Sequence, residues 1–239
     1  NPAINKIKII YIIGQLGKGG AEGQLFELSK GINKDRFKPI VVSLSHGSSI
    51  AVNGTKGDYW ADRIRGLGIE IIQIPRNSHV DFSRLLKLYK VFRQKRPLII
   101  HTYLQSANTY GRIAALFTKI PVIISSERSS YEIGKNKKRY AIYIDKILAY
   151  FTSGIICNSH NTSKLLIDSF SFDRKKIFTV HNGIRIERFS KINDFNNQKK
   201  LASKVIGNVA NLTRPKNYKL FLESSKIIIK NYKINNLKI

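Results

Sequence analysis

Short apolar segments rich in Ile, Val and Leu alternate with stretches of helical periodicity along most of this chain of 239 residues. Several of these segments are apolar throughout, which is typical of strands that helices cover on both faces. The predicted strands are 7–13, 39–44, 69–74, 98–101, 122–125, 154–157 and 176–180, and the predicted helices are 21–32, 59–67, 83–96, 106–118, 137–151 and 160–169. This order predicts an α/β fold built on a doubly wound, Rossmann-like parallel sheet.

The pattern changes after Asn182-Gly183, a strong turn signal. We expect a first domain over 1–190, a polar linker rich in Asn and Lys over 191–204, and a second α/β unit over 205–239. The second unit contains one predicted strand, 205–210, followed by one predicted helix. Because one strand and one helix bury little apolar area against each other, we expect this unit to be incomplete within the sequence.

The charge of the chain is strongly unbalanced, with 42 Lys and Arg against 15 Asp and Glu, a formal net charge of +27. A surplus of this size attracts nucleic acid, anionic lipid or phosphorylated substrates. It is also explained by a bias toward Lys and Asn with mostly solvated charges, and both interpretations remain open. No helix-turn-helix, zinc or RNA-recognition pattern accompanies the charge, so we expect no nucleic acid partner.

Other features exclude several classes of protein. The longest apolar run, 7–13, is shorter than the ~20 residues that cross a bilayer, and no signal peptide is visible. The lone Cys157 excludes an internal disulfide framework and suits a reducing cytosol. His46 and His79 stand alone in polar loops, and no metal-ligand spacing occurs, so we expect no metal cofactor.

A glycine-rich loop, Gly14 to Glu22, joins the first predicted strand to the first helix. Glycines let backbone amides approach an anion, and the start of a helix adds partial positive charge. A dinucleotide-binding fingerprint would need Gly in place of Glu22, and a P-loop would need Lys-Ser or Lys-Thr after Gly19. A tight turn and a phosphate-binding loop both fit the glycines.

The segment Gly19-Gly20-Ala21-Glu22, which opens a helix after a strand, resembles the start of family 4 glycosyltransferases of the GT-B fold. Further segments resemble later motifs of the family in the same order, namely 99–104 with 111–115, 154–159 with 180–184, and 206–217. The resemblance implies that 1–190 is the acceptor-side domain and 205–239 the incomplete start of the donor-nucleotide-binding domain.

The resemblance implies a retaining glycosyltransferase that needs no metal. Such an enzyme moves a sugar from a nucleotide-sugar donor to a lipid-linked or growing cell-surface glycan. The family also implies that loop amides bind the donor diphosphate, here at Gly17, Gly19 and Gly20. Preorganised hydrogen-bond donors aimed at the departing diphosphate supply much of the rate in such reactions.

The family's donor domain normally adds one Arg and one Lys to the diphosphate site. Lys216 matches the Lys, but the Arg position aligns with Asn211. Arg214 lies on the same loop and is our candidate substitute, with a solvated loop arginine as the alternative. The family's pair of Glu residues spaced by seven positions does not occur before Ile239, so the sequence as given should bind donor poorly and turn over little.

Three acceptor-side candidates lie at predicted strand ends, where open α/β sheets bind ligands. His101 ends one strand, and Glu127 and Arg128 follow the next. We expect them to bind sugar hydroxyls or donor phosphate; a structural role for His101 and a Glu127–Arg128 pair are the alternatives. Asn182 and the preceding His181 are expected to shape a turn and not to contact substrate.

Two predicted helices combine basic, apolar and aromatic residues, as in helices that bind an anionic membrane surface. The basic residues proposed for this surface are Lys87, Lys90, Arg93, Lys137 and Lys138. They predict a protein at the cytoplasmic, inner face of the plasma membrane, unless the apolar faces simply cover the sheet. The alternative functions are a non-catalytic membrane- or glycan-binding remnant of a transferase and, less favoured, a basic nucleic-acid-binding α/β protein.

Overall fold

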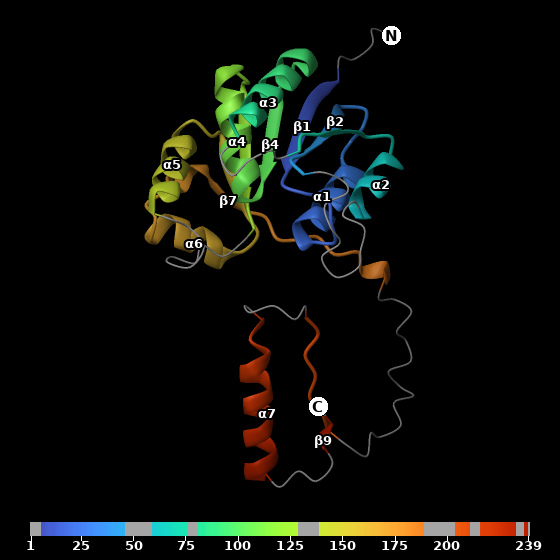
Figure 1. The fold of residues 1–239 in the computed structure, drawn as a ribbon, viewed down its shortest axis with the longest axis vertical. Helices are drawn as coiled ribbons and strands as arrows, with labels where there is room; N and C mark the ends of the chain where they lie inside the picture. Colours follow the sequence, from blue (N-terminus) through green and yellow to red (C-terminus); the bar gives the residue numbers. More distant parts are fainter. Residues whose placement is uncertain are drawn as a thin grey trace. The chain divides into compact units, whose positions relative to one another are not determined.

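The seven predicted strands of the first domain form one parallel sheet, which confirms the predicted fold class (Figure 1). The strand order is β3-β2-β1-β4-β5-β6-β7. The strands are β1 Ile7–Ile13, β2 Phe37–Ser43, β3 Glu70–Gln73, β4 Ile99–Tyr103, β5 Val122–Glu127, β6 Gly154–Cys157 and β7 Ile177–Thr179.

The structure is a computed structural model, and it describes residues 6–45, 59–75, 81–128, 139–188, 204–210, 216–232 and 237–238. The chain divides into two units, Asn1–Gly183 and Ile184–Ile239. The predicted linker, 191–204, lies outside the described residues except for Lys204, and the predicted domain limits stay predictions.

Six helices accompany the sheet in the described part of the first unit: α1 Gly20–Gly31, α2 Tyr59–Arg65, α3 Phe82–Lys95, α4 Leu104–Phe117, α5 Arg139–Tyr150 and α6 His160–Asp168. Figure 1 shows α1 beside α2 and α3 beside α4. Strand β1 packs against both pairs of helices. Ile10 and Ile12 join a buried cluster with side chains of α3 and α4, whereas Ile9 and Ile13 join another with α1 and α2. Burial on both faces is the reason that this strand is apolar throughout.

Helix α4 approaches the sheet closely at Gly111. A Cβ atom at this position would lie 2.6 Å from Cγ2 of Thr102 and 2.9 Å from Cδ1 of Ile12. The absence of a side chain therefore lets α4 pack against β1 and β4, which lie at the centre of the sheet.

Two strands extend further at their carboxyl ends than the sequence pattern predicts. Strand β4 continues to Tyr103, which pairs with Ile13, and β5 continues to Glu127. His101 therefore lies inside β4 and does not end it, which corrects the prediction. The reason is that backbone pairing with neighbouring strands continues through polar residues, whereas the prediction stopped where the apolar run stopped.

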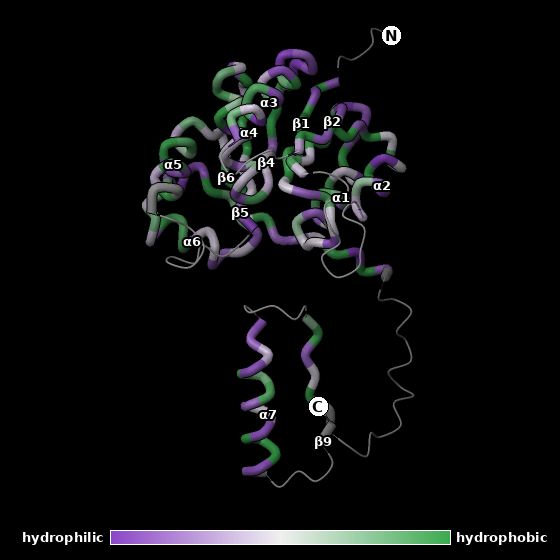
Figure 2. The backbone as a smooth tube through the Cα atoms, viewed as in Figure 1, coloured by the Kyte–Doolittle hydropathy of each residue, from purple (hydrophilic) through white to green (hydrophobic). Residues whose placement is uncertain are grey.

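The second unit contains β8 Lys204–Val205, α7 Tyr218–Tyr232 and β9 Leu237–Lys238 among its described residues. Strands β8 and β9 pair in parallel over two residues. The predicted strand 205–210 is wrong beyond Val205, because the described part of this unit offers no ladder partner for 206–210. Hydrophilic and hydrophobic residues alternate along α7 (Figure 2), and four of its large apolar residues, Leu220, Leu222, Ile227 and Ile229, are exposed.

None of the helices in the described part of the chain has the length and apolarity needed to cross a bilayer.

Candidate active site at the carboxyl edge of the sheet

The strand order reverses between β1 and β4, because successive strands are added on one side of β1 and then on the other. In open parallel sheets, ligands bind outside the carboxyl ends of the strands at such a reversal. At this point β4 passes directly into α4. Leu104, the first residue of α4, turns the chain from the strand into the helix with a left-handed φ of 68°. A bulky residue in this conformation costs about 1–3 kcal/mol, and such strain is concentrated at functional sites. These features indicate a candidate ligand site at the carboxyl edge near β1, β4 and β5.

The residues of the glycine loop after β1 differ in burial. Within it, Leu16 is fully buried, whereas Gly20 is exposed and Gly17 is partly buried. The amide of Gly19 donates to the carbonyl of Gly17 over 2.8 Å, so this donor is already used within the loop. The role of Gly17, Gly19 and Gly20 in holding a diphosphate stays a prediction.

Sequence reasoning missed Glu22, which lies over the loop. A Cβ atom on Gly19 would lie 2.0 Å from Oε2 of Glu22, so a side chain at position 19 would displace this carboxylate. Burial raises the pKa of Glu22, although hydrogen bonds from its own backbone amide and the side chain of Gln15 act in the opposite direction. The carboxyl group of Glu22 thus lies at the start of α1, where the helix dipole favours negative charge. A Glu three residues after the residue that caps the helix was the available signal.

His101 is held on both ring nitrogens within the sheet. Its Nε2 lies 2.8 Å from the hydroxyl of Ser126, and its Nδ1 lies 3.4 Å from the hydroxyl of Tyr103. Burial, assisted by the positive charge of Arg128, lowers the pKa of His101 to about 3. The imidazole is therefore neutral near neutral pH and serves as a hydrogen-bonding group.

We predict that His101 makes the folded state sensitive to acid. The unfolded chain binds a proton at this histidine below about pH 6.5, whereas the folded chain does so only near pH 3. As the pH is lowered from about 6.5 to about 3, this group should therefore reduce the free energy of unfolding by about 1.4 kcal/mol per pH unit. Urea unfolding followed across this range should show a shallower pH dependence for His101→Gln than for wild type. The exposed His160 provides the matched variant, His160→Gln, and an equal change in both variants would contradict the assignment.

Glu127 is buried at the end of β5 and is fixed by a residue of α4. Nδ2 of Asn108 donates to Oε1 of Glu127 over 2.7 Å and to the carbonyl of Ser126 over 3.2 Å. The other side of the amide, Oδ1, accepts from the hydroxyl of Thr102 over 2.7 Å. Asn108 thus ties β4 and β5 to α4, and the sequence offered no signal for it because its partners are distant in the chain.

Arg128 lies directly after Glu127 and is partly buried. Its Nη1 donates to Oδ1 of Asn182 over 2.6 Å, and its guanidinium carbon lies 5.3 Å from the centre of the Tyr103 ring. Its Nε is buried and has no hydrogen-bond partner, and among the described residues no carboxylate lies within salt-bridge distance of it. Burial lowers the pKa of this guanidinium. A cation of this kind, short of compensating charge, suits an anionic ligand.

The structure brings His101, Glu127 and Arg128 together, and it does not test the other predicted side-chain positions. Lys216 is exposed and belongs to the second unit. Arg214 lies outside the described residues, as do Asn211, Lys137 and Lys138. In the described ranges no group of three or more His, Cys, Asp or Glu residues is placed to hold a metal ion.

The predicted membrane residues Lys87, Lys90 and Arg93 are exposed on α3. On the same helix, the apolar side chains of Phe82 and Leu86 are also exposed. Helix α5 has a larger apolar face, formed by Tyr143, Ile144, Ile147 and Tyr150 with the following Phe151. Both helices therefore expose apolar groups to solvent.

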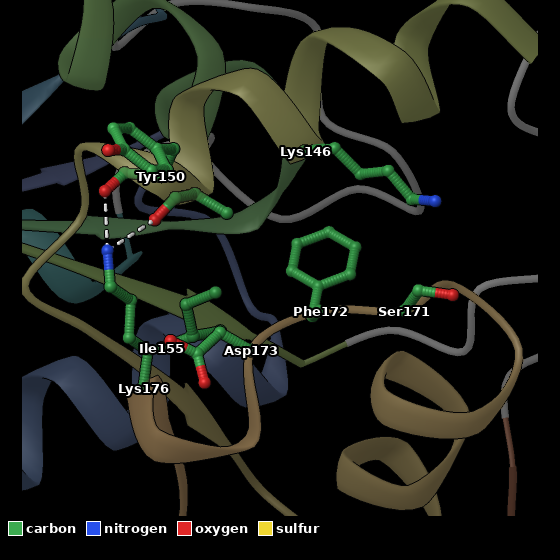
Figure 3. A pocket seen from close by; sticks show the side chains of 8 residues that line it. Lys146, Tyr150, Ile155, Ser171, Phe172, Asp173 and Lys176 are labelled. Carbon is green, nitrogen blue, oxygen red and sulfur yellow. Dashed lines mark hydrogen bonds between the residues drawn. The ribbon is translucent and has the colours of Figure 1, made fainter.

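A cavity of about 250 Å³ lies next to the end of α5 and the residues that precede β7 (Figure 3). The apolar side chains of Ile155 and Phe172 contribute to its lining. Lys176, which immediately precedes β7, donates from Nζ to the carbonyls of Ala149 and Tyr150 and so caps the end of α5. This lysine stabilises the helix end, and the cavity contains none of the predicted site residues.

A model of Glycosyltransferase Family 4 matches residues 18–188 of the chain. The chain is 27% identical over 188 residues to the UDP-Gal:alpha-D-GlcNAc-diphosphoundecaprenol alpha-1,3-galactosyltransferase of Escherichia coli, a match that covers 75% of this chain and 49% of that protein. It is 31% identical over 170 residues to the capsular polysaccharide biosynthesis glycosyltransferase CapM of Staphylococcus aureus, covering 66% of this chain and 45% of that protein. The chain thus spans about half the length of these relatives.

Solved structures share the fold. The structure of Anabaena HepE in complex with UDP matches with a TM-score of 0.68 and 16% identity, over 97% of this chain and 68% of that one. A glycosyltransferase from Rickettsia africae matches with a TM-score of 0.62 and 15% identity, over 98% and 68%.

Proposed function

The chain belongs to glycosyltransferase family 4, and on that premise we propose that the whole protein transfers a sugar, with retention, from a nucleotide-sugar donor to a lipid-linked or growing cell-surface glycan. The names of the relatives support this proposal. The Escherichia coli enzyme is named for a UDP-sugar donor and a diphosphoundecaprenol acceptor, and CapM is named for capsular polysaccharide biosynthesis.

The observation that carries the proposal is that Arg128 is partly buried without a carboxylate partner among the described residues. A partly buried guanidinium with no carboxylate partner among the described residues lies at the carboxyl edge of β5. Negative charge grows on the diphosphate as the bond between the sugar and the diphosphate of the donor breaks. A preorganised cation stabilises that charge. A guanidinium also binds phosphate oxygens with two parallel hydrogen bonds. We therefore assign Arg128 to a diphosphate group.

The remaining groups fit roles around this cation. Glu127, oriented by Asn108, supplies a fixed hydrogen-bond acceptor at the end of β5. Neutral His101 maintains the hydrogen bonds beneath the site. Lys216 and Arg214 of the second unit are proposed to add positive charge to the diphosphate. In this proposal these cationic side chains stabilise the leaving group without a metal, so a chelator should leave turnover unchanged.

We also propose that the protein acts at the inner face of the plasma membrane. The exposed apolar residues of α3 and α5, the basic residues Lys87, Lys90 and Arg93, and the net charge of +27 support docking on anionic lipid. Sedimentation with vesicles that contain anionic lipid should decrease steeply with added salt. Binding that is equal for neutral and anionic vesicles would contradict this part of the proposal.

The main test is a transfer assay with a panel of UDP-sugars and an undecaprenyl-diphosphate acceptor that carries N-acetylglucosamine. We expect transfer from one donor, with a product that keeps the anomeric configuration of the donor by NMR. Transfer with inversion would contradict the retaining mechanism. Vesicle or acceptor binding without transfer from any donor would favour a non-catalytic binding protein instead.

A further inference from the structure

The segment that leaves the sheet after β7 crosses the carboxyl edge and is hydrogen-bonded to α1. The side chain of Gln24 bonds both backbone groups of Gly183: its Nε2 donates to the carbonyl over 2.8 Å, and its Oε1 accepts from the amide over 2.9 Å. The two residues are 159 positions apart in the sequence. A two-point bond of this kind fixes both the position and the orientation of the turn.

The turn held in this way carries Asn182, whose Oδ1 accepts from Nη1 of Arg128 over 2.6 Å. Arg128 is thereby connected through Asn182 and Gly183 to Gln24 on α1, the helix that follows the glycine loop. The division between the two units falls directly after Gly183. The turn is therefore both the exit of the chain from the sheet and a hydrogen-bonded link between α1 and the end of β5.

The chemistry of the acceptor on Asn182 matters as much as its position. A long arginine side chain loses considerable rotamer freedom when it is fixed, and a hydrogen bond made in advance removes part of that loss from ligand binding. A neutral amide oxygen orients the guanidinium without neutralising it. A carboxylate at the same place would orient it equally well but would compete with any anionic ligand.

We propose that Asn182 and Gln24 are positioning residues that hold Arg128 as a preoriented cation, without a carboxylate partner among the described residues, for a diphosphate group. This inference rests on the proposed function, because the diphosphate belongs to the substrate of that reaction. Asn182 acts directly on Arg128, and Gln24 acts through the turn.

The decisive variant is Asn182→Asp, tested on the full chain with inorganic pyrophosphate as the probe. Calorimetric titration at constant pH and ionic strength should show binding weakened by about tenfold or more, because the new carboxylate lies within hydrogen-bond distance of the cation. Urea unfolding should show an unchanged or higher free energy of unfolding, because the same change adds a charge-assisted hydrogen bond. A purely structural role for Asn182 would not produce weaker binding together with equal or greater stability.

The matched control is Gln94→Glu. This residue is exposed near the end of α3, at the opposite edge of the sheet, and the substitution changes the net charge by the same amount. Gln24→Glu replaces the donor to the carbonyl of Gly183 by a carboxylate oxygen and adds one negative charge, and it should weaken pyrophosphate binding by a factor of about three to ten. Gln94→Glu should bind pyrophosphate as wild type does.

Wild-type pyrophosphate affinity in Asn182→Asp, or an equal loss in Gln94→Glu, would overturn the inference. Wild-type affinity in Arg128→Gln would overturn the proposed role of Arg128 and the inference with it. If wild type transfers no sugar in the assay above but the Asn182 and Arg128 variants lose pyrophosphate binding, the proposed reaction fails and the positioning role stands.

Discussion

Asp145→Asn is expected to lower the free energy of unfolding by about 3–5 kcal/mol. Nη2 of Arg112 lies 2.6 Å from Oδ1 of Asp145, and the two side chains are only 2% and 3% exposed. Loss of the carboxylate leaves a buried guanidinium without its counter-charge, although its Nε still donates to the carbonyl of Asn108. Chemical unfolding by urea, followed by circular dichroism, measures the loss.

The exposed pair formed by Arg65 and Asp62 provides the matched control for this prediction. Its N–O distance is similar, 2.8 Å, but the side chain of Asp62 is 82% exposed. Asp62→Asn should therefore change the free energy of unfolding by less than about 1 kcal/mol. Replacing both buried partners together, as Arg112→Met with Asp145→Leu, should recover much of the loss, since no buried charge then remains unpaired. Equal small losses in the buried and exposed variants would show that the buried pair is not desolvated as the structure indicates.

Arg128→Gln is expected to lower turnover by about 10²–10³-fold, the usual effect of removing a preorganised group that stabilises the departing charge. The free energy of unfolding should change little, because Arg128 has a buried unpaired Nε and only one hydrogen-bonded partner among the described residues. Arg128→Lys should restore little activity, since an ammonium cannot reproduce the planar fork of a guanidinium. Steady-state kinetics in the transfer assay, together with urea unfolding, separate the two effects.

Arg36→Gln is the control for loss of one positive charge. Arg36 is exposed just before β2, at the edge of the sheet opposite to the site. Its variant should retain wild-type turnover. Equal reductions in the Arg36 and Arg128 variants would mean that total charge, and not a specific diphosphate contact, controls the rate.

Much of the fold was predictable because its signals are local. The continuous apolar run of β1 indicated a strand buried on both faces, and Ile10 and Ile13 indeed face different clusters. The ends of β4 and β5 were predicted less well, because backbone pairing with neighbouring strands extends past the point where apolar residues stop. His101 was placed at a strand end for this reason, although it lies inside the strand.

The candidate site was predicted only in part. The sequence indicated that Glu127 and Arg128 follow a strand, since chain order and the parallel sheet bring strand ends to one edge. It did not indicate that Glu22 would lie over Gly19, and the capping-box spacing that might have suggested it is a short and common pattern. It also assigned Asn182 only to a turn and missed its bond to Arg128.

The sequence by itself determined the order of strands and helices along the chain, the parallel sheet and the glycine loop. The reason is that periodicity and turn residues act over neighbouring positions. Only the tertiary structure decided which polar groups meet: Asn108 with Glu127, Arg112 with Asp145, and Gln24 with Gly183 across 159 positions. Hydrogen bonds require their atoms to meet within a few tenths of an ångström of about 2.9 Å and in the right direction. That precision arises from the packing of whole helices on the sheet, and no local pattern of residues encodes it.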